Sequence, residues 1–162
     1  REFLDFARPQ NPKLTLVSLN DILTKAVNFL KPELEKQQVE LVTDFDASLD
    51  PLRLDEGLLY RAFLNVLINA VQAMPEGGRL RVATRRPASP GVAAEVEISD
   101  TGSGMSAEKQ RQIFNPFFTD KYRGTGLGLA IAKNIMDSHR GSIAVESREG
   151  AGTTFRIGLV KL

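Results

Sequence analysis

The chain contains no cysteine, which excludes disulfide bonds and metal sites built from thiolates. Its charge is almost balanced, with 21 Lys and Arg against 20 Asp and Glu, so no whole-chain field favours nucleic acid or an anionic membrane as a partner. Every apolar run is shorter than the roughly 18–20 residues that cross a bilayer. The sequence also lacks internal repeats and low-complexity segments. Function must therefore be sought in local motifs.

The length and composition fit one globular domain with a short head. At 162 residues the chain can bury a sizeable core, and hydrophobic residues make up 42% of it. Because the first residue is Arg1 rather than Met, we expect a piece of a longer protein. Residues 1–6 are spaced like the last turns of an amphipathic helix, which Pro9 and Pro12 end. We therefore expect a helix end with its linker over residues 1–12 and one domain over residues 13–162.

Apolar periodicity predicts three helices in that domain. A capping box at Ser18 opens the first, which Pro32 could bend. Asp55 is a suitable N-cap for the second, which ends at Met74-Pro75. The third is expected over residues 127–139.

Alternating or apolar runs between these helices predict about five strands. They are expected at residues 39–45, 80–86, 92–99, 142–147 and 153–160. The last two form a hairpin through Gly150-Ala-Gly152. The expected fold class is an α/β (α+β) two-layer sandwich, in which three helices cover one face of a mixed, mostly antiparallel sheet.

The second predicted helix carries an asparagine pair, Asn65 and Asn69, on a line that continues to Gln72. Asparagine is a mediocre helix former and is costly to bury without partners. Its carbonyl is a hard oxygen donor of the kind that Mg²⁺ accepts. The alternative is that neighbouring backbone satisfies each amide. The nearby glycine loops favour a shared ligand.

Two glycine-rich loops follow the asparagine pair. Gly102 and Gly104 come just after Asp100, whose carboxylate could accept a hydrogen bond from an exocyclic amine such as that of adenine. Asp-Thr-Gly is also ordinary turn chemistry, so this loop alone decides nothing. The second loop, residues 124–128, runs straight into the third predicted helix, where backbone N–H groups and the helix dipole favour an anion. Together the loops and the asparagines predict a Mg-nucleotide site.

The second loop differs from the better-known phosphate loops. Leu129 stands where the dinucleotide fingerprint needs its third glycine, and no glycine is followed by the lysine of a P-loop. Between the two glycine loops, the phenylalanines at 114, 117 and 118 are expected to plug the core. Lys121 and Arg123 are the cations nearest the presumed phosphate loop, although a solvated loop tip is the plain alternative.

Five motifs in this order carry a family resemblance. They are Asn65-Val-Leu-Ile-Asn69, Asp100-Thr-Gly-Ser-Gly104, Asn115-Pro-Phe-Phe118, Gly124-Thr-Gly-Leu-Gly128 and Gly150-Ala-Gly-Thr-Thr154. They closely resemble the N, G1, F, G2 and G3 boxes in the catalytic and ATP-binding domain of bacterial sensor histidine kinases. That domain is a member of the gyrase, Hsp90, histidine kinase and MutL superfamily with the Bergerat ATP-binding fold. The short segment before the second glycine loop looks most like the nitrogen-regulation branch.

The resemblance implies ATP and Mg²⁺ as ligands and a role for each motif. It implies that Asn69 ligates Mg²⁺ with Asn65 lining the same site, and that Asp100 binds the adenine amine. The catalytic residues it implies are Asn65 and Lys121, with Lys121 reaching the phosphates. The threonine near adenine is expected to be Thr153, with Thr154 left open. The remaining residues implied to hold nucleotide are Gly102, Gly104, Gly124, Thr125, Gly126, Leu127 and Gly128.

One part of the family pattern is missing. The phosphoacceptor histidine of the family lies in a separate helical dimerisation domain, and no such segment occurs here. The only histidine, His139, ends the third predicted helix and is not expected to accept phosphate. The resemblance therefore implies one half of a two-part enzyme, whose partners are the phosphoacceptor domain of the same protein and the receiver domain of a response regulator. It further implies a cytoplasmic, monomeric fragment of a homodimeric parent, with any membrane anchor of the parent outside this segment.

The reaction implied is transfer of the γ-phosphoryl group of ATP to an imidazole nitrogen of that absent domain. One alternative is an ATPase switch of the gyrase or MutL kind. Those relatives carry a glutamate that activates water in the N box, where this chain has Asn65. A second alternative is a nucleotide-binding module without kinase activity, for which eroded motifs would be expected. Here the motifs are intact.

Overall fold

The computed structural model describes residues 11–116 and 128–162, and two of its longest helices begin as the sequence predicts. Helix α2 (Leu19–Lys36) is capped by Ser18, whose hydroxyl accepts from the Asp21 N–H at 3.3 Å, and it runs through Pro32. Helix α3 (Glu56–Gln72) is capped by Asp55, whose carboxylate accepts from the Leu58 N–H at 3.0 Å. Within the described residues, no helix combines the length and the apolar character needed to cross a membrane.

Five strands form the main sheet in the order β2-β4-β5-β7-β6. They are β2 (Val39–Asp44), β4 (Gly78–Arg85), β5 (Ala94–Asp100), β6 (Ser142–Ser147) and β7 (Thr153–Leu159). Only the β2–β4 pair is parallel, and α3 lies in the connection between these two strands. A parallel pair needs such a crossover, whereas the antiparallel β6–β7 pair is joined by a tight turn. The predicted mixed, mostly antiparallel sheet is confirmed.

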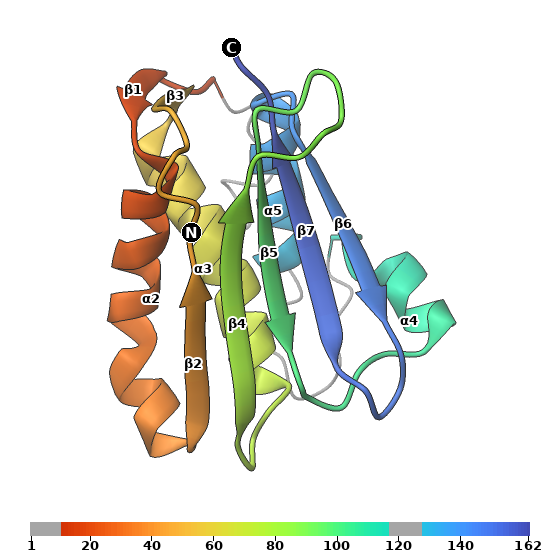
Figure 1. Cartoon of the computed structure of the whole chain (residues 1–162). Helices are drawn as coiled ribbons and strands as arrows, with labels where there is room; N and C mark the ends of the chain where they lie inside the picture. The colour runs from red at the N-terminus through yellow and green to blue at the C-terminus, as the bar shows by residue number, and fades with distance from the viewer. Residues whose placement is uncertain (1–10, 117–127) are drawn as a thin grey trace.

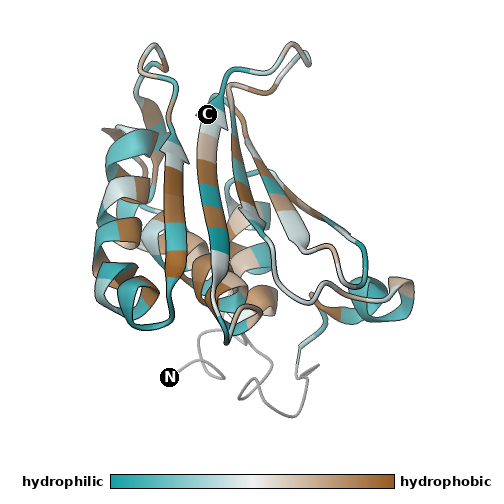
Figure 2. Ribbon diagram, turned by 60° about the horizontal axis from the view of Figure 1, so that its bottom comes forward, coloured by the Kyte–Doolittle hydropathy of each residue, from teal (hydrophilic) through white to brown (hydrophobic). Residues whose placement is uncertain are grey.

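Helices α2, α3 and α5 (Gly128–Ser138) lie on one face of the sheet, with α3 in contact with both of the others (Figure 1). Hydrophobic and hydrophilic residues alternate along the strands, as the banding in Figure 2 shows. In β5 and β7 the buried and half-buried residues alternate along the whole strand. The inward residues pack on the apolar stripe of α3 and form one core, which includes Phe63, Ile98 and Phe155.

The outer face of the sheet is held by ion pairs rather than by a second helix layer. Arg81 binds Glu97 at 2.7 Å, and Arg156 binds both Glu97 at 3.2 Å and Glu146 at 2.8 Å. The hydrogen bond that Arg156 donates to Glu146, followed by the charge of Glu97, raises the pKa of Arg156 above its ordinary value. These cross-strand pairs keep the exposed face polar, which suits a sheet covered on one side only.

The sequence prediction missed a small ribbon and a short helix. Strands β1 (Thr15–Val17) and β3 (Leu52–Leu54) pair antiparallel beside the main sheet. Three residues are too few to reveal an alternation. Helix α4 (Ala107–Gln112) has no buried residue, so it lacks the apolar stripe from which a helix is predicted. The helix end expected at residues 1–6 and most of its linker lie outside the described residues.

His139 joins the end of α5 to the start of α3. The ring is buried, with 1% of its surface exposed. Its Nδ1 lies 2.9 Å from the Ile135 carbonyl oxygen and must carry the proton, because a carbonyl only accepts. Its Nε2 then accepts from the Asp55 N–H at 3.0 Å. The single histidine of the chain is therefore a structural link between two helices.

Replacing this histidine tests the link. We expect His139→Ala to lower the free energy of unfolding by about 2–4 kcal/mol, because it leaves the Asp55 N–H unsatisfied and opens a cavity. Urea unfolding followed by circular dichroism measures the change. Lys133→Ala, on the exposed side of the same helix, is the matched control and should stay close to wild type. A His139→Ala protein as stable as the control would contradict the structural role.

Candidate functional site

The loop after Asp100 and the Gly150–Thr154 motif meet at one end of the sheet, where β5 and β6 end and β7 begins. The loop after β5 attaches to the C-terminal end of α3, since the Ser103 N–H donates to the Ala73 carbonyl at 3.3 Å. It also attaches to the β6–β7 turn, where the Gly150 N–H donates to the Ser103 carbonyl at 2.7 Å. Segments distant in sequence thus meet around the loop that follows Asp100.

Asp100 is the last residue of β5 and faces the helix layer. Only 4% of its surface is exposed. One carboxylate oxygen accepts the Gly102 N–H at 2.8 Å, which is the turn geometry that Asp-Thr-Gly allows. The turn and a ligand-binding role are compatible, because a carboxylate has several acceptor positions. The structure therefore provides a buried acceptor at the end of the sheet.

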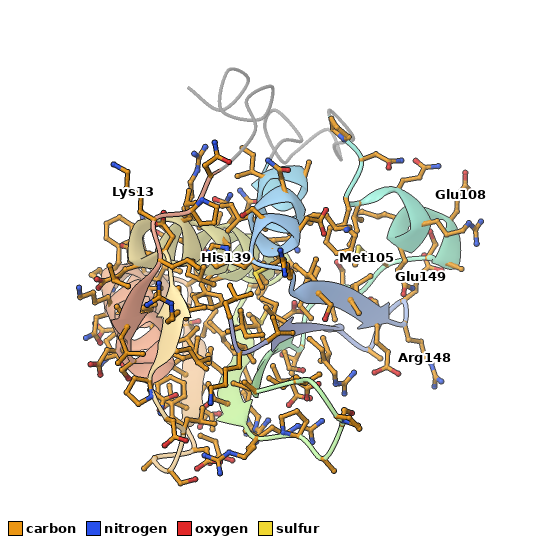
Figure 3. The ribbon with its side chains drawn as sticks, turned by 90° about the horizontal axis from the view of Figure 1, so that it is seen from above. Lys13, Met105, Glu108, His139, Arg148 and Glu149 are labelled. Atoms are coloured by element: carbon orange, nitrogen blue, oxygen red, sulfur yellow. The ribbon has the colours of Figure 1, made fainter. Side chains whose placement is uncertain are left out.

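Gly102 and Gly104 are required by close backbone contacts. A Cβ atom on Gly102 would overlap the carbonyl of Ala73 at the end of α3. One on Gly104, whose φ is +72°, would overlap the carbonyl of Arg148. Figure 3 labels Met105, Arg148 and Glu149 where the loop runs past the β6–β7 turn. These two glycines are therefore required for the loop to pack against α3 and the β6–β7 turn.

Thr153 and Thr154, which the sequence left open, face opposite sides of the sheet. Thr153 is paired with Asp100 in the β5–β7 register and is 4% exposed. Thr154 is half-buried on the outer face, where its hydroxyl lies 2.7 Å from that of Ser99. Directly opposed residues in an antiparallel pair share one face. Thr153 is therefore the threonine that lies beside Asp100.

The two asparagines of α3 are half-buried, and Gln72 is exposed. The amide nitrogen of Asn65 donates to the carbonyl oxygen of Gly128, the first residue of α5, at 3.0 Å. This bond is the backbone contact that the sequence left as an alternative, and it ties α3 to the end of the second glycine loop. Asn69 lies one turn further on, and its backbone carbonyl accepts the Ala73 N–H at 3.2 Å at the end of the helix. The structure thus gives Asn65 a positioning contact.

Several predicted site residues cannot be placed. Lys121, Gly124, Thr125, Gly126 and Leu127 lie outside the described residues. Of the three phenylalanines expected to plug the core, Phe114 packs edge-on against Phe155, with ring centroids 6.2 Å apart. Phe117 and Phe118 lie outside the described residues.

Ser147, at the end of β6, was not predicted. It is opposite Thr153 in the β6–β7 register, and their hydroxyl oxygens lie 2.8 Å apart. The hairpin at Gly150–Gly152 could have revealed it, because an antiparallel hairpin fixes which residues face each other. The sequence analysis used that turn only to end the strands.

A groove of about 400 Å³ lies elsewhere, between α2 and the N-terminal end of α3. Its lining includes Lys25 and Glu56, which form an ion pair at 2.9 Å. The hydrogen bond and then the charge of Glu56 raise the pKa of Lys25. Because the loop after Asp100 attaches to the opposite end of α3, at Ala73, this groove is separate from the residues described above.

A family model decides the affiliation. The model for histidine kinase-, DNA gyrase B- and HSP90-like ATPases matches residues 54–162, which is about two thirds of the chain. The chain belongs to this ATPase family. The resemblance drawn from the five motifs is thereby confirmed.

Curated relatives of this ATPase domain are sensor histidine kinases. The signal transduction histidine-protein kinase AtoS of Escherichia coli K12 is 36% identical over 157 residues, which cover 97% of this chain and 26% of AtoS. The sensor histidine kinase ZraS of Salmonella typhimurium is 33% identical over 158 residues, which cover 98% of this chain and 34% of ZraS. The chain therefore spans about a quarter to a third of the length of these relatives.

Solved structures of histidine kinases share the fold. The catalytic domain of ThkA superposes with a TM-score of 0.81 at 27% identity, over 92% of this chain and 96% of that domain. Full-length ShkA in complex with AMPPNP superposes with a TM-score of 0.87 at 24% identity, over 99% of this chain and 35% of ShkA. ThkA in complex with the response regulator TrrA superposes with a TM-score of 0.77 at 24% identity, over 92% of this chain and 42% of the ThkA chain. The predicted two-layer sandwich of this ATPase family is confirmed.

The close fit of the first glycine loop can be tested by adding one methyl group. We expect Gly102→Ala to lower the thermal midpoint by several degrees, because its Cβ would push the loop off Ala73. Gly57→Ala is the matched control, since its Cβ would make only an ordinary 3.7 Å contact inside a helix. That control should be neutral or stabilising. A Gly102→Ala protein as stable as wild type would rule out the close approach.

Proposed function

We propose that this chain binds ATP with Mg²⁺ and presents the γ-phosphoryl group to a histidine on a separate helical phosphoacceptor domain. The observation that carries this proposal is the pairing of two buried polar residues, Asp100 and Thr153, at the sheet end where the C-terminal end of α3 holds the loop after β5. Membership of the ATPase family and the kinases among its relatives support the nucleotide and the reaction class.

The base of the nucleotide is held at the Asp100 end of the sheet. The Asp100 carboxylate accepts a hydrogen bond from the exocyclic amine of adenine. Thr153 lies next to Asp100 on the same face of the sheet. The loop of Gly102 and Gly104 passes over this position, and its close contacts with α3 and the β6–β7 turn keep it in place. Preorganised acceptors of this kind recognise a base by the donors it offers.

The phosphates are held nearer to the start of α5. Gly128 begins a helix of 11 residues, whose N-terminus attracts anions. Lys121, Gly124, Thr125, Gly126 and Leu127, which precede it, complete the phosphate site in this proposal. The contact from Asn65 to the Gly128 carbonyl fixes α3 against this end of the helix.

Mg²⁺ suits the donor chemistry of α3. Asn69 offers one carboxamide oxygen, and Mg²⁺ in nucleotide sites takes few protein ligands and keeps waters and phosphate oxygens for the rest. A bound Mg²⁺ would neutralise charge on the phosphates. Asn69 would hold the ion, and Asn65 would keep the helices in register.

The phosphoryl acceptor must come from another part of the protein. The chain has one histidine, His139, and both of its ring nitrogens are engaged, one with Ile135 and the other with Asp55. A ring that is 1% exposed offers no nucleophile to a bound nucleotide. We therefore place the acceptor on a dimerisation domain of the parent homodimer, and the next acceptor on the receiver domain of a response regulator. The fragment itself would be a cytoplasmic monomer.

Transfer is favoured over hydrolysis by the nature of Asn65. Its amide nitrogen is committed to the Gly128 carbonyl, and an amide cannot act as a general base for water. Phosphoryl transfer depends mainly on positioning and charge neutralisation, which this arrangement supplies. We expect slow hydrolysis by the chain alone and faster transfer once an acceptor domain is added.

Labelling tests the proposed transfer. The chain is incubated with γ-labelled ATP, Mg²⁺ and a separately purified phosphoacceptor domain from a related kinase or the parent. We expect label on the acceptor histidine, and about tenfold or more weaker ATP binding with little label for Asp100→Asn, which loses a charged acceptor. Thr154→Ala, on the outer face, is the matched control. ATP binding without label on any acceptor would favour a regulatory nucleotide-binding module, and rapid phosphate release would favour an ATPase switch.

The metal role is tested without reference to activity. ATP affinity is titrated with and without Mg²⁺ for wild type, Asn69→Ala and Gln72→Ala. We expect Asn69→Ala to lose most of the affinity gained from Mg²⁺ and to keep most of the affinity measured without it, since the proposed role of Asn69 is to hold the ion. Gln72→Ala, exposed on the same helix, should retain both values. If Mg²⁺ raises ATP affinity equally in all three proteins, Asn69 is not the metal ligand.

A further inference from the structure

Three polar residues form one row across neighbouring strands at the site end of the sheet. Asp100 of β5 is opposite Thr153 of β7, and Thr153 is opposite Ser147 of β6. Directly opposed residues in antiparallel strands point to the same face and have Cβ atoms about 5 Å apart. Ser147 is therefore one strand further from Asp100 but on the same side of the sheet.

The Ser147 hydroxyl makes three contacts at once. It accepts from the Met105 N–H at 2.8 Å and donates to the Gly152 carbonyl at 2.9 Å. Its third neighbour is the Thr153 hydroxyl, at 2.8 Å. A hydroxyl has one proton to donate and two lone pairs to accept with. Its hydrogen-bonding capacity is thus filled by these three partners.

This saturation fixes the direction of the Thr153 hydroxyl. Ser147 gives its only proton to Gly152, so the bond between the two side chains requires Thr153 to donate to Ser147. The Thr153 oxygen then has only lone pairs left for a ligand. Since an ionised carboxylate also only accepts, Asp100 and Thr153 present acceptors side by side.

Acceptors side by side distinguish two classes of purine. At position 6 itself, a 6-aminopurine carries two N–H donors, whereas a 6-oxopurine carries a carbonyl that two acceptors would repel; the donor on that edge of a 6-oxopurine is the neighbouring N1–H. A Thr153 hydroxyl released from Ser147 could rotate and donate to that carbonyl. The orientation of one proton therefore bears on which base is accepted.

We propose that Ser147 is a positioning residue that makes the base site selective for 6-aminopurine over 6-oxopurine nucleotides, by holding the Thr153 hydroxyl as a donor to itself. This inference rests on the proposed nucleotide site at Asp100. Ser147 acts through Thr153 and through the loop carrying Met105, and it does not touch the base.

The ratio of the dissociation constants for inosine and adenosine diphosphate tests the role of Ser147. These two ligands differ only in the group at position 6 of the base and in the proton at the neighbouring N1. We measure both by calorimetry on the 162-residue chain. Wild type should prefer ADP, and Ser147→Ala should narrow the preference roughly 3- to 10-fold, the value of one neutral hydrogen bond. Ser142→Ala, exposed on the same strand, is the matched control and should keep the wild-type ratio.

A double-mutant cycle separates positioning from general loosening of the site. In a Thr153→Val protein, adding Ser147→Ala should not lower the ratio of the dissociation constants further, because no Thr153 hydroxyl remains to be oriented. If Ser147→Ala lowers this ratio equally in wild type and in Thr153→Val, the proposal is overturned. Ser147→Thr keeps a hydroxyl and should retain the wild-type ratio. If Ser147→Ala does not fold, Ser147→Cys replaces it, since a thiol keeps the volume and weakens the hydrogen bonds.

The failures of the two proposals are distinguishable. If wild type binds neither diphosphate, the nucleotide site itself is wrong and this inference falls with it. If wild type binds ADP and the ratio is the same for wild type and Ser147→Ala, only the role of Ser147 is overturned.

Discussion

The antiparallel register of β5, β7 and β6 is the constraint on which the candidate site depends. It brings Asp100, Thr153 and Ser147 into one row on the side of the sheet that the helices cover. Because side chains alternate between the faces of a strand, a slip of one residue would move Asp100 to the outer face, among ion pairs. The buried residues of β5 and β7 prevent that slip, since it would also expose Ile98 and Phe155. Core packing and site geometry are therefore set together.

Helix α3 connects the parts of the molecule that this register leaves apart. Its N-terminus is tied to α5 through Asp55 and His139, and its middle is tied to the start of α5 through Asn65. Its C-terminal carbonyl at Ala73 holds the loop that follows β5. The only histidine of the chain is thus used for packing, in a family whose kinase members transfer phosphate to histidine.

Much of this arrangement was predictable from local sequence. Helix caps and strand alternation depend on neighbouring residues alone. The starts of α2 and α3, capped by Ser18 and Asp55, and the bounds of β5 and β7 therefore agree with the sequence prediction to within two or three residues. Helix α4 was not predicted, because a short helix with no buried residue leaves no periodic signal. Strands β1 and β3 are stabilised by each other across the chain, and neither is long enough to be recognised alone.

The sequence by itself determined the family, since five motifs in order are a property of the chain, and it showed that the chain has a single histidine. Only the tertiary structure decided which threonine stands beside Asp100, because Thr153 and Thr154 differ in nothing but the face of the sheet. It also decided that Asn65 bonds to Gly128 and that Ser147 bonds to Thr153. Such contacts join residues on different elements, and their hydrogen bonds exist only once the helices and strands have packed.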